Sequence, residues 1–347
     1  MIRLLQSDLT KVTLFFILTI LASAVISPWL YNAGMLLAEV GQSRDLNPIL
    51  DWAANRCSGR AFATYYDHTL LISALALAGP FIMWCNLSEQ SSRQPANPWR
   101  VKLAKSRSSS QCGQALYRDP KATLHFGIGL LIAVSLVTIP IVMIHMSGWL
   151  SFRHSVDYPN IIVKGLVSAA IIAVICEWLF RGMLMGIFLR AMHPALAMVF
   201  ISLLYAVICS LMPGGSEILT DPDKADAGFR MASMMIAELM TLEKFVFSFM
   251  LIFCFGLVLA YARYRTASLW LPIGLHLGFV FPYNMLSQIT TLGPKSSQIP
   301  KILKGPDGSS GMLPFYLLII SALLVHIILQ MLESKKTSAN DTSSSSQ

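Results

Sequence analysis

Long apolar runs alternate with polar segments along most of the 347-residue chain. A helix needs about 18 or more apolar residues to cross a lipid bilayer, and eight runs of the sequence reach this length. The runs lie near residues 12–38, 68–87, 122–148, 161–189, 195–212, 245–262, 267–286 and 312–332. The pattern therefore predicts an all-α, polytopic membrane protein whose eight transmembrane helices form a bundle.

The composition excludes a water-soluble enzyme. Hydrophobic residues make up 55% of the chain and charged residues only 13%, whereas soluble domains carry about 25% charged residues. The first apolar run follows Arg3 and Lys11, which is the arrangement found in a secretory signal peptide. Because this run continues through Trp29 and Leu37, it is too long for a signal peptide and is interpreted as a span.

The distribution of basic residues predicts the orientation of the spans. If the N-terminus is cytoplasmic, the inner segments contain 14 basic and 5 acidic residues, and the outer segments contain 11 basic and 12 acidic residues. Cytoplasmic loops of membrane proteins are enriched in Lys and Arg, so both termini are expected in the cytoplasm. The net charge of +8 is explained by this topology, so we expect membrane lipids as partners and no nucleic acid.

The polar segments carry weaker signals. Residues 88–120 are rich in Ser, Pro and basic residues and are interpreted as a solvated cytoplasmic loop, with a contact to anionic lipid headgroups as the alternative. The tail from 333 to 347 has too few apolar residues to pack and is expected to be disordered.

The sequence has no Gly-rich phosphate loop, which argues against a nucleotide partner. Its six cysteines form no CxxC pair, so neither a disulfide framework nor a zinc ribbon is indicated.

The fourth run contains two charged residues, Glu177 and Arg181, in the string EWLFRG. A charged side chain at membrane depth is costly and is a functional candidate. Residues four apart lie on one helical face, so Glu177 and Arg181 are expected to pair. Two interpretations stay open at this point: a pair that only holds neighbouring helices in register, or part of a reactive site.

Three strings in the second half of the chain together resemble one protein family. EWLFRG resembles the EExxxRG motif of the CPBP family, the intramembrane glutamic endopeptidases that include CAAX prenyl proteases and bacteriocin-processing or self-immunity proteins. SLLYAVIC, which contains Tyr205 and Cys209, is similar to the family's SLLFAxxH segment. SLWLPIGLH, which contains Trp270 and ends at His276, is similar to its SLWxxIxxH segment. The order and the span placement of the three strings agree with an eight-helix family fold.

The resemblance also implies a division of the chain. Residues 121–332 would be the membrane core of CAAX-protease type. Residues 1–120 would supply spans one and two with the basic loop, and residues 333–347 the tail. A bacterial plasma membrane is the location that the resemblance favours, and a lipidated or otherwise membrane-associated peptide is the partner that it implies.

The resemblance assigns roles to residues, but several of them are replaced. In the family, the first Glu of the EE pair and the His of the second motif are thought to activate water, and the third motif supplies a His and an Asn that stabilise an oxyanion. These positions are here Cys176, Cys209, His276 and Val280. Glu177 and His276 are therefore the candidate catalytic residues, and Arg181, Tyr205 and Trp270 are candidate supporting residues. Because a helix turns about 100° per residue, Glu177 should face away from the position of Cys176 unless the helix is locally distorted.

The two cysteines at motif positions suggest a further possibility. Cys176 and Cys209 lie at similar depth on consecutive spans, and together with His276 they have the ligand types of a zinc or copper site or of a Cys–His nucleophile. The alternative is that both are small apolar packing residues, and we expect neither a metal nor another cofactor. The other histidines, His326 among them, lack a partner three or four residues away and are interpreted as packing or interfacial residues.

Three functions remain compatible with these residues. The first is an endopeptidase that cuts a membrane-associated peptide. The second is a pseudoprotease, a scaffold or immunity-type protein that binds a peptide with the same bundle and does not cut it. The third is a transporter, for which an intramembrane charge pair is also typical, although the sequence has no inverted repeat or Gly/Pro-broken helix pair.

Overall fold

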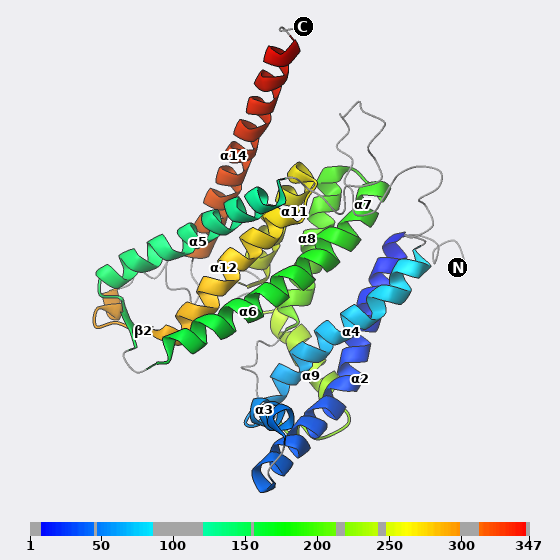
Figure 1. Cartoon of the computed structure of the whole chain (residues 1–347). Helices are drawn as coiled ribbons and strands as arrows, with labels where there is room; N and C mark the ends of the chain where they lie inside the picture. The colour runs from blue at the N-terminus through cyan, green and yellow to red at the C-terminus, as the bar shows by residue number, and fades with distance from the viewer. Residues whose placement is uncertain are drawn as a thin grey trace. The chain divides into compact units, whose positions relative to one another are not determined.

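A computed structural model describes residues 8–44, 47–85, 121–153, 156–212, 219–241, 248–298 and 312–344. Most of the described residues are helical, and two short antiparallel strands, β1 (Leu150–Phe152) and β2 (Thr290–Leu292), pair with each other (Figure 1). The helices in chain order are α2 (Asp8–Ser43), α3 (Pro48–Cys57), α4 (Phe62–Trp84), α5 (Ala122–Met146), α6 (Tyr158–Cys176), η2 (Glu177–Leu184), α7 (Met185–Ala191), α8 (Pro194–Ser210), α9 (Ala227–Leu239), α11 (Met250–Thr266), α12 (Trp270–Ile289), η4 (Ser296–Gln298) and α14 (Leu313–Ser344).

A helix lies over each of the eight predicted apolar runs, and the protein is an integral membrane protein. Among the described residues, five helical stretches are long and apolar enough to cross a membrane: Thr10–Ser43, Phe62–Trp84, Ala122–Met146, Tyr158–Leu189 and Leu313–Leu332. The apolar helix Pro194–Ser210 is shorter. The all-α fold is as predicted, and five of the eight predicted spans meet this criterion of length and composition in the described part of the chain.

Contacts divide the chain into two compact units. Unit 1 comprises Met1–Gln90 and Leu204–Ile252, and unit 2 comprises Ser91–Leu203 and Phe253–Gln347. Each unit is therefore made of two separate stretches of the chain, whereas the sequence analysis places its first boundary at residue 120. The cause is that α9 packs on α2, a contact between segments almost 200 residues apart that no local pattern encodes.

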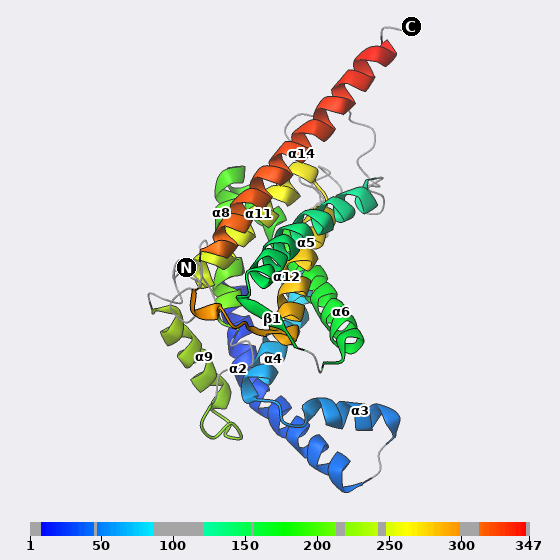
Figure 2. The same cartoon turned by 90° about the vertical axis from the view of Figure 1, so that its left-hand side faces the viewer.

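Unit 1 is built around the packing of α2 with α4 and α9, and α3 joins α2 to α4 (Figure 2). Ser23 on α2 hydrogen-bonds to Thr69 on α4 over 2.9 Å inside this unit. Gly228 allows α9 to lie directly on α2, since a Cβ atom there would come within 1.9 Å of the Ala24 carbonyl oxygen. Small residues let helix backbones approach closely in this way in membrane proteins.

Unit 2 places α12 between α5 and α6 (Figure 1). α5 and α12 meet through glycines: a Cβ atom at Gly274 would lie 2.3 Å from the Phe126 carbonyl oxygen, and one at Gly278 would lie 2.9 Å from that of Leu130. An apolar cluster from α5, α11, α12 and α14 fills the interior of the unit, with Ile132, Leu259, Leu275 and Val325 among its buried members. This packing fixes α11 and α12, the two helices that face the charged residues of η2.

The structure has helices in segments that were expected to be loops or a disordered tail. α3 and α9 occupy segments that the sequence analysis leaves as loops, because neither is long enough to register as an apolar run. α14 continues to Ser344, into the tail expected to be disordered; the sequence has no Gly or Pro between Leu332 and Ser344 to end the helix. The basic segment 88–120 lies outside the described residues.

Candidate functional site

The segment that carries Glu177 and Arg181 is a π-helix. α6 runs without interruption into η2 (Glu177–Leu184), which has π-helical hydrogen bonding, and η2 runs into α7. π-helical segments are rare and occur frequently at functional sites. Every residue of η2 except Trp178 is buried. The local distortion that would be needed to redirect Glu177 is therefore present at this residue.

Glu177 lies between two cationic or protonatable side chains. Its Oε1 atom accepts a hydrogen bond from Arg181 Nη1 at 3.2 Å, as the four-residue spacing predicts, and lies 2.8 Å from His276 Nδ1. The exposed fractions are 0% for Glu177 and Arg181 and 2% for His276. The structure thus brings together α6–η2 and α12, the two elements on which the sequence analysis places candidate catalytic residues.

α11 forms one wall of this site. The carbonyl oxygen of Gly256 accepts from Arg181 Nη2 at 3.1 Å, and Arg263 Nε donates to the Arg181 carbonyl oxygen at 3.4 Å. The ring of Phe255 stands edge-on to the His276 ring, with centroids 5.4 Å apart and an interplanar angle of 82°. The sequence analysis gives none of these three residues a role, although Arg263 is only 2% exposed. Only the fold shows that α11 faces η2.

The two carboxylate oxygens of Glu177 differ in their hydrogen bonding. Oε2 is buried and has no hydrogen-bond partner among the described residues. Buried carboxylate oxygens are almost always hydrogen-bonded, because leaving one unsatisfied costs about 1–3 kcal/mol or more. Oε2 is therefore the carboxylate oxygen that lacks a donor in the described part of this site.

Comparison with known proteins identifies this region. Residues 158–281 match the family of type II CAAX prenyl endopeptidases, Rce1-like. No curated protein and no solved structure matches the chain. The match to the CAAX endopeptidase family covers 124 of the 347 residues and contains Glu177, Arg181 and His276. It confirms the family resemblance that the three sequence strings carry.

The remaining motif positions of the CAAX-endopeptidase-like segment have varied surroundings. Cys176 is half-buried at the end of α6. Val280 is half-buried one turn after His276, in the apolar cluster that includes Ala169 and Ala173 of α6. Trp270 begins α12, is 47% exposed, and makes an edge-on contact with Phe126.

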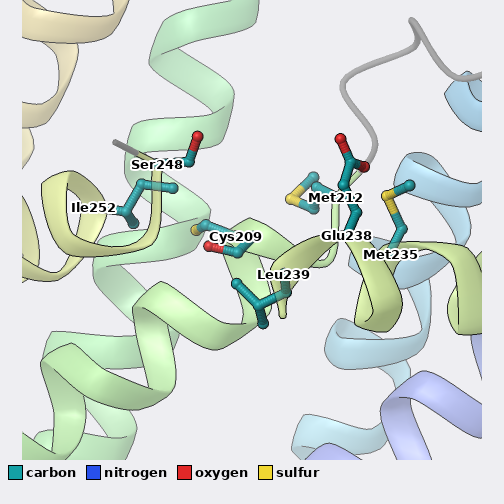
Figure 3. Close-up of a pocket in the computed structure, with 8 residues that line it drawn as sticks. Cys209, Met212, Met235, Glu238, Leu239, Ser248 and Ile252 are labelled. Carbon is teal, nitrogen blue, oxygen red and sulfur yellow. The ribbon is translucent and has the colours of Figure 1, made fainter. Parts of the chain in front are cut away.

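Two motif positions lie on the part of α8 that belongs to unit 1. Tyr205 is buried, with 4% exposure, and Cys209 is half-buried. Cys209 lines a cavity of unit 1 together with residues of α8, α9 and the start of α11 (Figure 3). Among the described residues, no three His, Cys, Asp or Glu side chains lie close enough together to hold a metal ion. Glu238, a half-buried acid that the sequence analysis does not single out, also lines this cavity.

Proposed function

We propose that this membrane protein is an intramembrane endopeptidase in which His276, oriented by Glu177, activates water for attack on a peptide bond. The observation that carries the proposal is the 2.8 Å contact between His276 Nδ1 and Glu177 Oε1 in a fully buried site. A base whose ring is held by a buried carboxylate is the arrangement that general-base catalysis by histidine requires.

The hydrogen bond between His276 and Glu177 supports Nε2 as the nitrogen that acts. With Glu177 as a carboxylate paired to Arg181, which stays protonated, the proton between Glu177 and His276 belongs to Nδ1. The lone pair of the neutral ring is then on Nε2. In the proposed reaction, water attacks the scissile carbonyl carbon and gives a proton to Nε2. The tetrahedral intermediate collapses when the C–N bond breaks and the same proton passes to the leaving amine.

Glu177 has a supporting role in this scheme. Its Oε1 holds the imidazole ring in place and stabilises the imidazolium ion that forms after proton transfer. Arg181 holds the carboxylate from the other side and is itself held by the Gly256 carbonyl oxygen. The assignment differs from the family scheme, in which the first Glu of the motif acts on water, because that position is Cys176 in this chain.

The replacement of polar residues at three motif positions favours a second function. Val280 cannot donate a hydrogen bond to a developing oxyanion, and it lies among apolar side chains. Cys176 and Cys209 replace the other two polar groups. A pseudoprotease that binds a peptide in the same bundle, as a scaffold or immunity-type protein, is the alternative that these replacements support.

The proposed function includes a topology and a partner. We propose eight spans, both termini in the cytoplasm, and the plasma membrane of a bacterium as the location. The charge distribution and the eight apolar helices support this topology. The proposed substrate is a lipidated or otherwise membrane-associated peptide, because a site within membrane-spanning helices is reached most easily from the bilayer.

Peptide cleavage by the full-length protein in lipid nanodiscs tests the proposal. The substrates are fluorogenic peptides with and without a prenyl or acyl chain, and the variants are His276→Gln and Glu177→Gln. The matched controls are His145→Gln, an exposed histidine, and Glu238→Gln, a half-buried glutamate outside the site. We expect cleavage to be abolished by His276→Gln, reduced by Glu177→Gln, and unchanged in both controls.

Restoring the family residues separates the two functions. If the wild type cleaves no peptide but a triple variant with Cys176→Glu, Cys209→His and Val280→Asn does, the chain is a pseudoprotease on an inherited fold. Cleavage by the wild type that survives His276→Gln would show that the proposed base is not the base.

A further inference from the structure

A second cluster of polar side chains joins α11 to α14 within unit 2. Tyr261 Oη lies 2.5 Å from His326 Nδ1, and Arg265 Nη1 donates to Tyr261 Oη at 2.8 Å. The guanidinium of Arg265 also lies over the Tyr261 ring, 5.8 Å from its centroid. His326 is therefore more than the isolated packing residue that the sequence suggests.

Arg265 has a fixed role in this cluster. Arginine can only donate, so the Tyr261 oxygen accepts from Arg265. A hydroxyl group forms more than one hydrogen bond, and Tyr261 Oη also pairs with His326 Nδ1. The two bonds connect Arg265, Tyr261 and His326, and connected hydrogen bonds polarise one another.

Apolar side chains flank this cluster along both helices. Val325 and Leu329 of α14 and Leu259 of α11 belong to the apolar interior of unit 2, and Tyr261 itself packs against it. Tyr261 hydrogen-bonds to His326, and Arg265 is connected to this pair through Tyr261. A part-buried hydrogen bond constrains two helices more strongly than a fully exposed one, because less solvent competes for its partners.

The same helix carries the contacts of the Glu177 site. Phe255, Gly256 and Arg263 of α11 reach His276 and Arg181, whereas Tyr261 and Arg265 point to the α14 side. A helix is stiff over three turns, so the rotation and the depth of α11 set by His326 are transmitted to the wall of the site. A small displacement of a catalytic group is sufficient to reduce a rate substantially.

We propose that Tyr261 and His326 are positioning residues for the Glu177–His276 site, and that their hydrogen bond fixes α11 against α14. The proposal rests on the proposed function for its effect on catalysis. Its effect on the geometry of His276 is independent of whether any peptide is cleaved.

The test uses a matched pair of substitutions in the full-length protein in nanodiscs. His326→Asn keeps a hydrogen-bonding group at the position of Nδ1, and His326→Leu has nearly the same shape without that group. Tyr261→Phe removes the hydroxyl group, and with it also the hydrogen bond from Arg265. Two quantities are measured in each variant: the ring ¹⁵N NMR signals of His276, assigned with His276→Gln, and the rate of peptide cleavage.

We expect His326→Leu and Tyr261→Phe to shift the His276 signals and to lower kcat about tenfold, as the loss of one such hydrogen bond predicts. The double variant should lose no more than Tyr261→Phe alone, because Tyr261→Phe already lacks the hydrogen bond to His326. His326→Asn should restore the wild-type signals and rate.

The proposal is overturned if His326→Asn and His326→Leu behave alike, or if both lower only the thermal unfolding midpoint and leave the His276 signals unchanged. If the wild type cleaves no peptide, the proposed function fails, and the His276 signals alone still decide whether His326 positions the site.

Discussion

Replacing Glu177 by Gln should destabilise the protein far more than replacing both Glu177 and Arg181. The single substitution removes a negative charge next to Arg181, whose side chain is fully buried. Arg181 would keep the Gly256 carbonyl oxygen as a partner, but a neutral dipole compensates a buried charge only in part. The double variant with Arg181→Met leaves no ion to bury.

The structure gives the magnitude of this effect. Opposite charges 3.2 Å apart attract by about 5 kcal/mol at an effective dielectric constant of about 20. Desolvation of both ions offsets most of this attraction in the intact pair. Removal of one partner leaves the other desolvated, so Glu177→Gln should lower the free energy of unfolding by about 3–5 kcal/mol. Arg181→Met should cost less, because His276 stays beside Glu177. The double variant should lie within about 2 kcal/mol of the wild type.

The assay is reversible unfolding by SDS in mixed micelles, followed by circular dichroism, for the wild type, both single variants and the double variant. The exposed pair Asp221–Lys224, with a 2.7 Å contact, is the matched control: its double-mutant cycle should show a coupling of less than about 1 kcal/mol. Additive losses at Glu177 and Arg181 would refute the reasoning, since they would mean that neither residue depends on the charge of the other.

Three further outcomes are expected. Gly228→Ala should destabilise unit 1 by about 1–3 kcal/mol, measured by the same unfolding assay, because its Cβ atom would overlap the Ala24 carbonyl oxygen. Val280→Asn should raise the cleavage rate in nanodiscs, because it adds a donor one turn after His276. The hydrogen bond from Lys224 lowers the pKa of Asp221. The ionised Asp221 side chain therefore stabilises the loop that precedes α9 fully above the ordinary pKa of Asp, and this stabilisation is lost as pH falls through the lowered pKa. The NMR signals of this loop should follow the change.

Each of these outcomes has a control. Gly79→Ala should leave stability nearly unchanged, because a Cβ atom there meets nothing within 4 Å. Val280→Leu keeps an apolar side chain and should not raise the rate. Asp221→Asn should abolish the acid-induced change in the loop, and it keeps a residue type that tolerates the φ of 50° at this position. A loop transition that persisted in Asp221→Asn would assign the titration to another group.

The positions of the apolar helices were predictable because hydrophobicity is a local property of the sequence. Each of the eight apolar runs is occupied by a helix, since a chain segment in lipid must satisfy its backbone hydrogen bonds internally. α3 and α9 were missed for a related reason. They have 10 and 13 residues, and short amphipathic segments of this kind are held by packing on their neighbours and not by their own length.

The site was predictable in part. The pairing of Glu177 with Arg181 follows from a spacing of four residues, which is a local rule. The contact between His276 and Glu177 joins positions 99 residues apart. Regular α-helical geometry predicts that Glu177 faces elsewhere, and the contact occurs where the chain forms the π-helical η2. The contacts of Arg263 and Gly256 and the hydrogen bond between Tyr261 and His326 were not predictable, because no periodicity reports which helix faces which.

The sequence by itself determined that this is a helical membrane protein, which family it resembles and that Glu177 and Arg181 form a charged pair. These features could be predicted because hydrophobicity, helical periodicity and short motifs are properties of neighbouring residues. Only the tertiary structure decided that Glu177 turns toward His276, that α11 forms the wall of the site and that the chain forms two interleaved units. These features depend on the packing of distant segments, such as the close approach of α5 and α12 at their glycines, and packing is a property of the whole fold.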